Sequence, residues 1–239
     1  MSTALITGAN RGLGLEYVRQ LAGSGWKVLA TCRSPDRAEA LRRVAGESGR
    51  AVEVHALDTG DPQSIGALSA AVGDQPIDLL VCNAGVSLMK PALITGRDGQ
   101  RIQDADDALW FEAYRTNAIG PLRVAAAFAD RVAASERRRM AFMSTHMSVV
   151  GENHSGAYYI YRASKAALNI IVKNLAIELA PRGITCVLLH PGWVRTDMGG
   201  AGADLTTEES VSGMLKILLD ARLPKKLQFL DYRGETVPW

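Results

Sequence analysis

The stretch TALITGANRGLG, residues 3–14, joins a short apolar run to a turn that contains three glycines. The residues that follow, LEYVRQLAGSG, place apolar side chains at helical spacing, so the sequence predicts a strand, a glycine turn and a helix in direct succession. Gly8, Gly12 and Gly14 permit a tight turn, close approach of the backbone to a diphosphate, and close contact between helix and strand. The N–H groups at the start of the helix would then face an anion. The spacing is G-x3-G-x-G rather than the general fingerprint G-x-G-x-x-G, so a glycine-rich turn without a ligand is the alternative.

Apolar runs that are typical of buried strands alternate with segments of helical period along most of the chain. The predicted strands cover residues 3–7, 26–31, 51–57, 77–82, 140–145 and 184–190. The predicted helices cover residues 13–24, 36–46, 62–73, 106–135, 158–180 and 207–220. This alternation requires parallel strands joined by crossovers, and nearly continuous apolar strands indicate helices on both faces. We therefore expect an α/β fold, a Rossmann-type doubly wound parallel sheet of about seven strands, in a single domain over residues 1–239.

The composition argues against several classes of function. Hydrophobic residues make up 47% of the chain, charged residues make up 22%, and the formal net charge is only +2. The densest basic run, Arg137–Arg139, is typical of a solvated helix end, so no nucleic-acid partner is expected. No segment approaches the roughly 18 apolar residues of a membrane span, and residues 1–8 do not resemble a secretory signal. We expect a cytoplasmic protein without a membrane partner.

The cysteines and histidines do not form a metal-binding pattern. The cysteines are far apart and lie in or beside apolar runs, as reduced core thiols do: Cys32, Cys82 and Cys186. The histidines show no ligand spacing either: His55, His146, His154 and His190. We expect no metal site.

The residues at the end of the second predicted strand, LATCRS at 29–34, indicate which dinucleotide the turn would bind. A site for NAD usually carries an acidic residue here for the ribose 2′-hydroxyl, whereas an arginine can pair with the 2′-phosphate of NADP. Arg33 lies in this region, no acid occurs before Asp36, and Arg11 lies in the glycine turn. The pattern favours NADP(H) over NAD(H). The alternative is that both arginines are solvated surface groups.

The stretch GAYYIYRASKAAL, residues 156–168, contains three tyrosines and then a lysine. A tyrosine has a pKa of about 10 in water, so it needs a neighbouring cation to act as an acid or base at neutral pH. Positions i and i+4 share one face of a helix, which pairs Tyr161 with Lys165 and equally Tyr158 with Arg162. Spacing alone does not choose between the two pairs, and a structural tyrosine is a further alternative.

Taken together, these motifs resemble the short-chain dehydrogenase/reductase family over essentially the whole chain. The matching residues, in the family's order, are Thr7, Gly8, Gly12, Gly14, Asp58, Asn83, Ala84, Gly85, Asn117, Tyr161, Arg162, Ala163, Ser164, Lys165, Pro191 and Gly192. The strings YRASKAALN, HPGWVRTDMGG and GETVPW are similar to the branch with C-factor-like proteins and small NADPH-dependent carbonyl reductases. The resemblance implies an NADPH-dependent reductase of a ketone or aldehyde. The alternative is an NADP(H)-binding signalling or regulatory protein in which turnover is incidental.

The resemblance also implies roles for individual residues. Tyr161 would give a proton to the carbonyl oxygen of a small-molecule substrate, Lys165 would lower the pKa of Tyr161 and hold the nicotinamide ribose, and Asn117 would position a water that links Lys165 to solvent. Asp58 would contact adenine, and Asn83 would order the backbone beside the adenosine ribose. The expected cofactor-binding residues are Gly8, Asn10, Arg11, Gly12, Leu13, Gly14, Arg33, Asp58, Asn83, Ala84, Gly85, Tyr161, Lys165, Pro191, Gly192, Val194 and Thr196.

Two residues are candidates for the hydroxyl that binds the substrate oxygen. The family's serine pair at the end of the fifth strand maps onto Ser144 and Thr145, whereas the family's usual spacing before the tyrosine falls on Ser148. We favour Thr145, because the loop HMSVVGENHSGAYY is slightly longer than the family's norm, so the strand-end position is the better guide than the spacing. A threonine hydroxyl donates the same hydrogen bond as a serine hydroxyl. Ser148 stays open as the alternative.

Two further segments concern substrate access and assembly. Residues 193–207 are rich in glycine and polar residues and follow a predicted strand, which makes them a candidate substrate lid. Residues 95–107 are typical of an exposed loop. The resemblance and the apolar run at residues 125–128 permit a homodimer or homotetramer, although the same alanines suit packing within one chain.

Overall fold

Seven strands form one parallel sheet in the order β3-β2-β1-β4-β5-β6-β7. The computed structural model describes residues 1–88 and 106–239. The strands are β1 (Thr3–Ile6), β2 (Lys27–Cys32), β3 (Val52–Ala56), β4 (Leu79–Cys82), β5 (Arg139–Met143), β6 (Thr185–His190) and β7 (Gln228–Asp231). The chain moves outward from β1 to β3, returns to place β4 beside β1, and then moves outward the other way to β7. The prediction of a doubly wound parallel sheet in a single domain is therefore confirmed.

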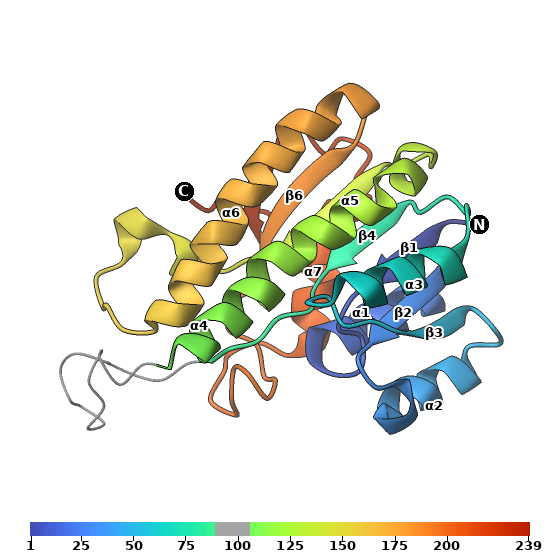
Figure 1. Cartoon of the computed structure of the whole chain (residues 1–239), viewed down its shortest axis with the longest axis horizontal. Helices are drawn as coiled ribbons and strands as arrows, with labels where there is room; N and C mark the ends of the chain where they lie inside the picture. Colours follow the sequence, from blue (N-terminus) through green and yellow to red (C-terminus); the bar gives the residue numbers. More distant parts are fainter. Residues whose placement is uncertain (89–105) are drawn as a thin grey trace.

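Helices cover both faces of this sheet (Figure 1). The apolar sides of α1 (Gly12–Gly23), α2 (Glu39–Glu47) and α7 (Thr207–Leu219) form one buried cluster with one face of the strands. The apolar sides of α3 (Pro62–Val72), α5 (Gly120–Ala133) and α6 (Tyr159–Leu179) form a second cluster with the opposite face. Both clusters contain residues from adjacent strands, as expected for strands whose side chains point alternately to the two faces. Helix α4 (Asp107–Tyr114) runs into α5 and lies against α6.

The structure differs from the sequence-based expectation in two places. Strand β7 was not among the predicted ranges, because its sequence QFLD has only two apolar residues, Phe229 and Leu230, between polar ones. It pairs with β6 at the edge of the sheet, and Leu230 also bridges to Thr236. The single helix predicted over residues 106–135 is divided by a π-helical turn, Arg115–Ile119, into α4 and α5. The loop expected at residues 95–107 lies outside the described residues except for its last two positions.

The π-helical turn has a cause in the sequence TNAIGP. Pro121 carries no N–H, so it cannot donate to the carbonyl of Asn117 four residues earlier. The N–H of Gly120 donates instead to the carbonyl of Arg115, five residues back. Gly120 also lies close to the loop after β3, where an added Cβ would sit 2.8 Å from the carbonyl oxygen of Thr59. The turn therefore widens the helix at Asn117, one of the predicted catalytic residues.

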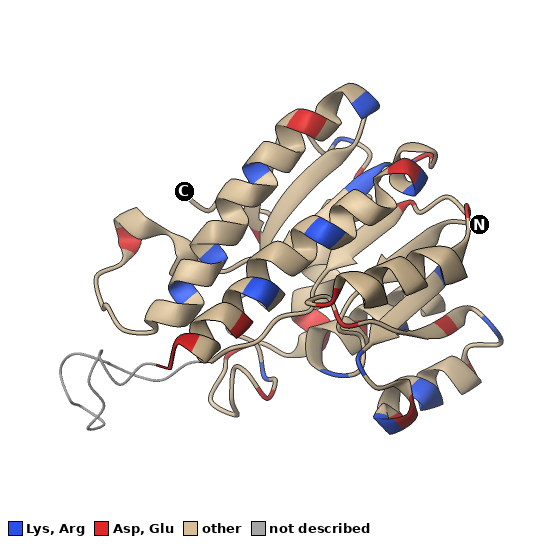
Figure 2. Ribbon diagram, viewed as in Figure 1, with Lys and Arg blue, Asp and Glu red and all other residues tan. Residues whose placement is uncertain are grey.

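Charged residues are distributed over the fold without a dominant sign. Figure 2 shows the positions of basic and acidic residues interspersed along the helices and loops of this view. The chain carries 27 basic and 25 acidic residues, which agrees with this mixture. The observation gives no support to a polyanion partner.

Candidate active site and cofactor cleft

The glycine turn after β1 lies beside the loop after β4, at the point where the sheet order reverses. Gly8 has a φ of +67°, and a Cβ added there would lie 2.9 Å from the Cα of Ala84. A Cβ at Gly14 would lie 2.6 Å from the Nδ2 of Asn83 and would clash with the carbonyl oxygen of Gly8. Glycine is therefore required at both positions, so that the two loops can pack together. In doubly wound folds this crevice is where dinucleotides bind.

Thr7 and Asn83 connect these two loops by hydrogen bonds. The Asn83 side chain donates to the carbonyl oxygens of Thr7 at 3.0 Å and Gly8 at 3.2 Å. The Thr7 hydroxyl oxygen accepts from the backbone N–H groups of Asn83 and Ala84, each at 3.0 Å. The structure thus brings the predicted residues Gly8, Asn83 and Ala84 together. Thr7 was matched to the family motif but not predicted to have a role of its own, and its position directly before Gly8 was the available signal.

The start of α1 is suited to bind a diphosphate. Arg11 is extended, with a φ of −161°, and no side chain in the described ranges caps the helix or places an acid in its first turn. The first N–H groups of α1 therefore face the glycine turn beside Gly12, and an anion there would be stabilised by them and by the helix dipole. Leu13 is half-buried against the core below, whereas Asn10 is exposed. These residues fit the diphosphate of a dinucleotide.

Arg11 also contacts the predicted lid. Its Nη1 lies 2.6 Å from the Oδ2 of Asp197, and the two side chains are 71% and 74% exposed. An ion pair this exposed contributes about 0–1 kcal/mol to stability. The contact therefore orients Arg11 over the cleft rather than stabilising the fold.

Two further predicted cofactor residues lie at the same edge of the sheet. Arg33 is exposed and follows β2, the strand beside β1. Asp58 follows β3 and is half-buried, and its Oδ1 accepts from the N–H of Gly60 at 2.8 Å. No ion pair of Arg33 occurs within residues 1–88 and 106–239. Its guanidinium is thus available to an anionic ligand from the cleft.

Tyr161, Lys165 and Thr145 meet at the ends of α6 and β5. Lys165 lies one helical turn after Tyr161, with its Nζ 6.0 Å from the centre of the Tyr161 ring. The Thr145 side chain lies close enough to the Tyr161 phenol to lower its pKa, and its hydroxyl oxygen accepts from the N–H of Met147 at 3.2 Å. Lys165 is buried, and its Nζ donates to the carbonyl oxygen of Met143 at 2.7 Å. The three side chains thus come from two elements whose ends lie side by side.

The surroundings of the phenol and the ammonium shift both pKa values. Burial raises the pKa of Tyr161 to about 12, and the hydrogen bond from Thr145 opposes this rise. Burial lowers the pKa of Lys165 to about 8. At neutral pH Tyr161 is therefore protonated and can donate a proton. Lys165 is mostly charged at neutral pH, but it lies close to the point at which it loses its charge.

Asn117 connects the π-helical turn to the loop after β4 and to α6. Its Oδ1 accepts from the N–H of Val86 at 2.8 Å, and its Nδ2 donates to the Val86 carbonyl at 2.9 Å and to the Ser164 hydroxyl at 3.0 Å. Ser164 in turn donates to the carbonyl of Tyr161 at 2.8 Å. A Cβ at Gly85 would lie 3.2 Å from Asn117 Oδ1 and 3.7 Å from Lys165 Nζ. Gly85, Asn117 and Lys165 therefore converge beside the tyrosine.

The two candidate hydroxyls have different surroundings. Ser148 donates to the carbonyl of Thr145 at 2.6 Å and accepts from the Nδ2 of Asn169 at 2.8 Å. The Oδ1 of Asn169 accepts from the hydroxyl of Ser144 at 2.6 Å. Ser148 is thus engaged on the side away from the tyrosine, whereas Thr145 faces it. Asn169 was not predicted as a site residue, because its partners lie more than twenty positions away in the sequence.

The alternative pair of Tyr158 and Arg162 is arranged differently. Tyr158 precedes α6 in the left-handed region, with a φ of +54°. The Arg162 guanidinium donates to the carbonyl of Met147 at 3.0 Å and to the hydroxyl of Ser155 at 2.9 Å. The arginine therefore ties the segment after β5 to α6 and does not serve the phenol of Tyr158.

Comparison with known proteins agrees with this geometry. The family model described as short chain dehydrogenase matches residues 2–204. The chain belongs to the short-chain dehydrogenase family. As a short-chain dehydrogenase/reductase it is a nicotinamide-dependent oxidoreductase, and the predicted membership of this family is confirmed.

Relatives of this short-chain dehydrogenase include proteins with named roles. It is 40% identical over 173 residues to the C-signal of Myxococcus xanthus, which covers 72% of the chain and 99% of that protein. The structure of an NADPH-bound carbonyl reductase from chicken fatty liver is 32% identical, with a TM-score of 0.88 over 100% of the chain and 99% of that structure. A carbonyl reductase from Pseudomonas aeruginosa PAO1 in complex with NADP is 32% identical, with a TM-score of 0.84 over 100% of both chains.

The predicted lid of this short-chain dehydrogenase is a compact loop between β6 and α7. The N–H of Leu205 donates to the carbonyl of Trp193 at 3.1 Å, and the N–H of Arg195 donates to the carbonyl of Leu205 at 2.9 Å. The indole of Trp193 donates to the carbonyl of Gly199 at 2.8 Å. A Cβ at Gly12 would lie 3.3 Å from the Cγ2 of Thr196, so the loop reaches the glycine turn. Pro191, Gly192 and Val194 lie in the same segment.

The described residues contain neither a cluster of metal ligands nor a helix that could span a membrane. Within residues 1–88 and 106–239, no three metal-ligating side chains gather at one place. In the same ranges, no helix is long and apolar enough to cross a membrane.

Proposed function

We propose that this short-chain dehydrogenase uses NADPH to reduce a ketone or an aldehyde to an alcohol. The observation that carries the proposal is the position of Tyr161, whose phenol lies near the Thr145 side chain and whose ring centre is 6.0 Å from the buried ammonium of Lys165. A proton donor, a second hydroxyl and a cation are the groups that carbonyl reduction requires from the protein. The carbonyl reductases among the similar structures support the same reading.

Each residue of the site would have a separate role in the reduction of the carbonyl group. A bound NADPH supplies a hydride to the carbonyl carbon. Tyr161 donates its proton to the carbonyl oxygen, and Thr145 donates a hydrogen bond to that oxygen and orients it. The charge of Lys165 favours the phenolate that remains and so assists the transfer. Ser148 would support Thr145 from behind rather than contact the substrate.

Asn117 would help to return a proton to this site. Pro121 has no N–H for the Asn117 carbonyl, and the side chain of Asn117 is fixed by Val86 and Ser164. The carbonyl can therefore accept from a water beside Lys165. Such a water would link Lys165 to solvent after each turnover.

The cofactor would lie across the switch point of the sheet. The glycine turn and the start of α1 would hold the diphosphate, Asp58 and Asn83 would flank the adenosine, and Pro191, Gly192, Val194 and Thr196 would meet the nicotinamide end. Arg33 would present its guanidinium at the adenosine end, and Arg11, which pairs with Asp197 in this structure, is a second basic group beside the glycine turn; both favour the 2′-phosphate of NADP(H) over the free hydroxyl of NAD(H). NADP in two of the similar structures supports this preference.

A panel of carbonyl compounds tests the proposed activity. Oxidation of NADPH and of NADH is followed with aliphatic and aromatic ketones and aldehydes. We expect turnover with at least one class and a higher kcat/KM with NADPH. Tight binding of NADPH without any turnover across the panel would contradict the reductase proposal.

The C-signal of Myxococcus xanthus supports a second proposal, a signalling or regulatory protein in which turnover is incidental. The same panel separates the two, because a sensor would bind NADP(H) and leave the carbonyl compounds unchanged. The retained set of Asn117, Tyr161 and Lys165 favours the reductase, since a sensor does not need a proton donor.

We also propose that the chain assembles with copies of itself and acts in the cytoplasm. Phe111, Ile170 and Ile177 are large apolar side chains that lie exposed on α4 and α6. The three cysteines are buried free thiols, which suits a reducing compartment. Light scattering coupled to size exclusion tests the assembly: a homodimer or homotetramer is expected, and a monomer at micromolar concentration would contradict it. Fractionation of expressing cells tests the location.

A further inference from the structure

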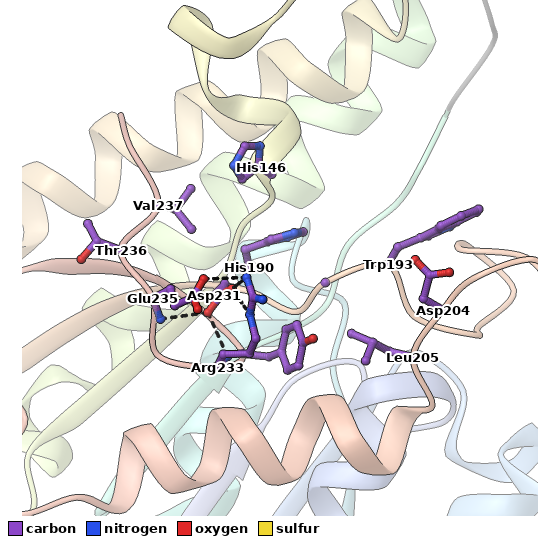
Figure 3. Close-up of a pocket in the computed structure, with 12 residues that line it drawn as sticks. His146, His190, Trp193, Asp204, Leu205, Asp231, Arg233, Glu235, Thr236 and Val237 are labelled. Carbon is purple, nitrogen blue, oxygen red and sulfur yellow. Dashed lines mark hydrogen bonds and ion pairs between the residues drawn. The ribbon is translucent and has the colours of Figure 1, made fainter.

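A pocket of about 350 Å³ lies at the carboxyl ends of β6 and β7. Figure 3 shows that three segments line it. His146 and His190 come from the ends of β5 and β6, Trp193 and Asp204 come from the lid, and residues 231–237 close the third side.

This pocket adjoins the proposed reaction centre. His146 directly follows Thr145, whose side chain lies near the phenol of Tyr161. The ends of β5 and β6 are in register, and the N–H of Ser144 donates to the carbonyl of Leu189 at 2.8 Å. The rings of His146 and His190 are therefore neighbours, with centroids 5.8 Å apart. A substrate whose carbonyl meets Tyr161 and Thr145 can extend into this space.

The charged groups of the pocket are mainly acidic. Three carboxylates line it, those of Asp204, Asp231 and Glu235, against the single guanidinium of Arg233. Arg233 is already shared, at 2.9 Å from Asp231 Oδ2 and 2.6 Å from Glu235 Oε2. Asp204 is exposed at the lid and forms no ion pair with any residue in the described ranges. Among the described residues that line the pocket, an added anion would thus meet carboxylates and no unpaired basic group; Arg195, in the lid, donates to the carbonyls of Ala203 at 2.8 Å and Asp204 at 3.4 Å.

The two histidines of the pocket do not offset its excess of acidic groups. Burial, together with the nearby His146, lowers the pKa of His190 to about 4, so its ring is neutral at neutral pH. His146 lies 3.0 Å from Glu152 Oε2, on the side of another carboxylate. The Nδ1 of His190 is buried and lacks a hydrogen-bond partner within the described residues. It can therefore exchange a hydrogen bond with an uncharged group of a ligand.

We propose that this pocket holds the non-reacting part of the substrate and selects neutral or cationic carbonyl compounds over those that carry a carboxylate or phosphate. Its aromatic walls, Trp193 and Tyr232, suit a flat or apolar group and can stabilise a cation. A carboxylate there would lie near Asp204 and Asp231, and like charges in a partly enclosed site repel strongly. The inference rests on the proposed reductase function.

Three para-substituted benzaldehydes test it: 4-formylbenzoate, its methyl ester, and the 4-trimethylammonio analogue. They share the reacting aldehyde and are of similar size, but they carry negative, zero and positive charge. Each kcat/KM is measured with NADPH for the wild type, for Asp204→Asn, and for Glu208→Gln. Glu208 is an exposed acid on α7 outside the pocket, so Glu208→Gln is the matched control.

We expect the wild type to prefer the ester and the cation. Asp204→Asn should raise kcat/KM for 4-formylbenzoate relative to the ester by about fivefold, and should lower it for the cation. The ratio between variant and wild type removes the different intrinsic reactivities of the three aldehydes. Glu208→Gln should leave all three ratios unchanged.

Ligand-observed NMR with the same three compounds and NADP⁺ gives a readout that does not need turnover. The pocket is supported if the cation and the ester bind more tightly than 4-formylbenzoate, and if this difference is smaller in Asp204→Asn. This holds even if no aldehyde is reduced, and in that case only the reductase proposal fails. Equal ratios in the wild type, in Asp204→Asn and in the double variant Asp204→Asn/Glu235→Gln would overturn the inference.

Discussion

The hydroxyl of Ser148 donates to the backbone carbonyl of Thr145 at 2.6 Å, so one candidate hydroxyl supports the residue that carries the other. Ser148 is buried and faces Asn169, whereas the Thr145 side chain faces the phenol of Tyr161. Sequence spacing left both residues as candidates for the substrate-binding hydroxyl, but their side chains have different partners in the structure. We infer a substrate contact for Thr145 and a supporting role for Ser148.

Replacement of Thr145 tests the substrate contact. Thr145→Val removes the hydroxyl and should lower kcat/KM by about 10- to 100-fold, as expected for the loss of 1–3 kcal/mol of transition-state stabilisation. Thr145→Ser keeps the hydroxyl and should retain most of the activity. NADPH affinity, measured by fluorescence titration, should be the same in both variants. Equal activity in Thr145→Val and the wild type would remove Thr145 from the mechanism.

Ser148→Ala tests the supporting role. Without this hydroxyl the Nδ2 of Asn169 loses its partner, and the Thr145 carbonyl loses its donor. We expect the free energy of unfolding to fall by about 1–3 kcal/mol, because buried polar groups are left without partners. Urea denaturation measures this. The loss in kcat/KM should be smaller than in Thr145→Val, and a stable but inactive Ser148→Ala would reverse the two assignments.

Tyr161→Phe tests the proton donor. The raised pKa of Tyr161 keeps the phenol protonated at neutral pH, so its proton is available for the carbonyl oxygen. Loss of a general acid typically costs about 10²- to 10⁴-fold in rate, and we expect a loss in this range for NADPH oxidation. NADPH affinity should stay near that of the wild type. Tyr158→Phe is the matched control and should remain active.

The pH dependence of stability tests the surroundings of Lys165. Its pKa is about 8 in the folded chain, against an ordinary value of 10.5, so between these two pH values the unfolded state binds more protons. The free energy of unfolding should therefore rise with pH in this window. Relative to Lys165→Met, the wild type should gain about 1–2 kcal/mol between pH 8 and 9.5, below the titration of the tyrosines. Identical pH dependence in the two proteins would contradict the shifted pKa.

The sequence predicted those features that depend on local pattern. Period and apolar runs located six of the seven strands, because each holds apolar residues and is flanked by turn residues, as in TALITG. The glycine turn was predicted with its neighbours because Gly8 and Gly14 act through the backbone, and their requirement is visible in residue type alone. Strand β7 was missed because its sequence QFLD holds only two apolar residues between polar ones, which is too short an apolar run to indicate a strand.

Features that depend on distant pairs could not be predicted from the sequence. Asn169 joins Ser144 and Ser148 across the ends of α6 and β5, and nothing in the local sequence indicates that contact. Helical spacing did not distinguish the pair of Tyr158 and Arg162 from the pair of Tyr161 and Lys165. In the structure Tyr158 lies outside α6, and Arg162 donates to the carbonyl of Met147. The acidic pocket likewise joins residues from the lid and the last strand, which meet only in the folded chain.

Arg33→Ala tests whether Arg33 distinguishes NADPH from NADH. Arg33 is exposed beside the adenosine end of the proposed site and has no ion pair within the described residues. Its loss should weaken NADPH binding by about 1–3 kcal/mol, the value of a charge-assisted contact to a phosphate, and should change NADH binding little. Arg43→Ala, an exposed arginine on α2, is the matched control. Equal losses for both dinucleotides would show that Arg33 acts on the shape of the loop and does not read the 2′-phosphate.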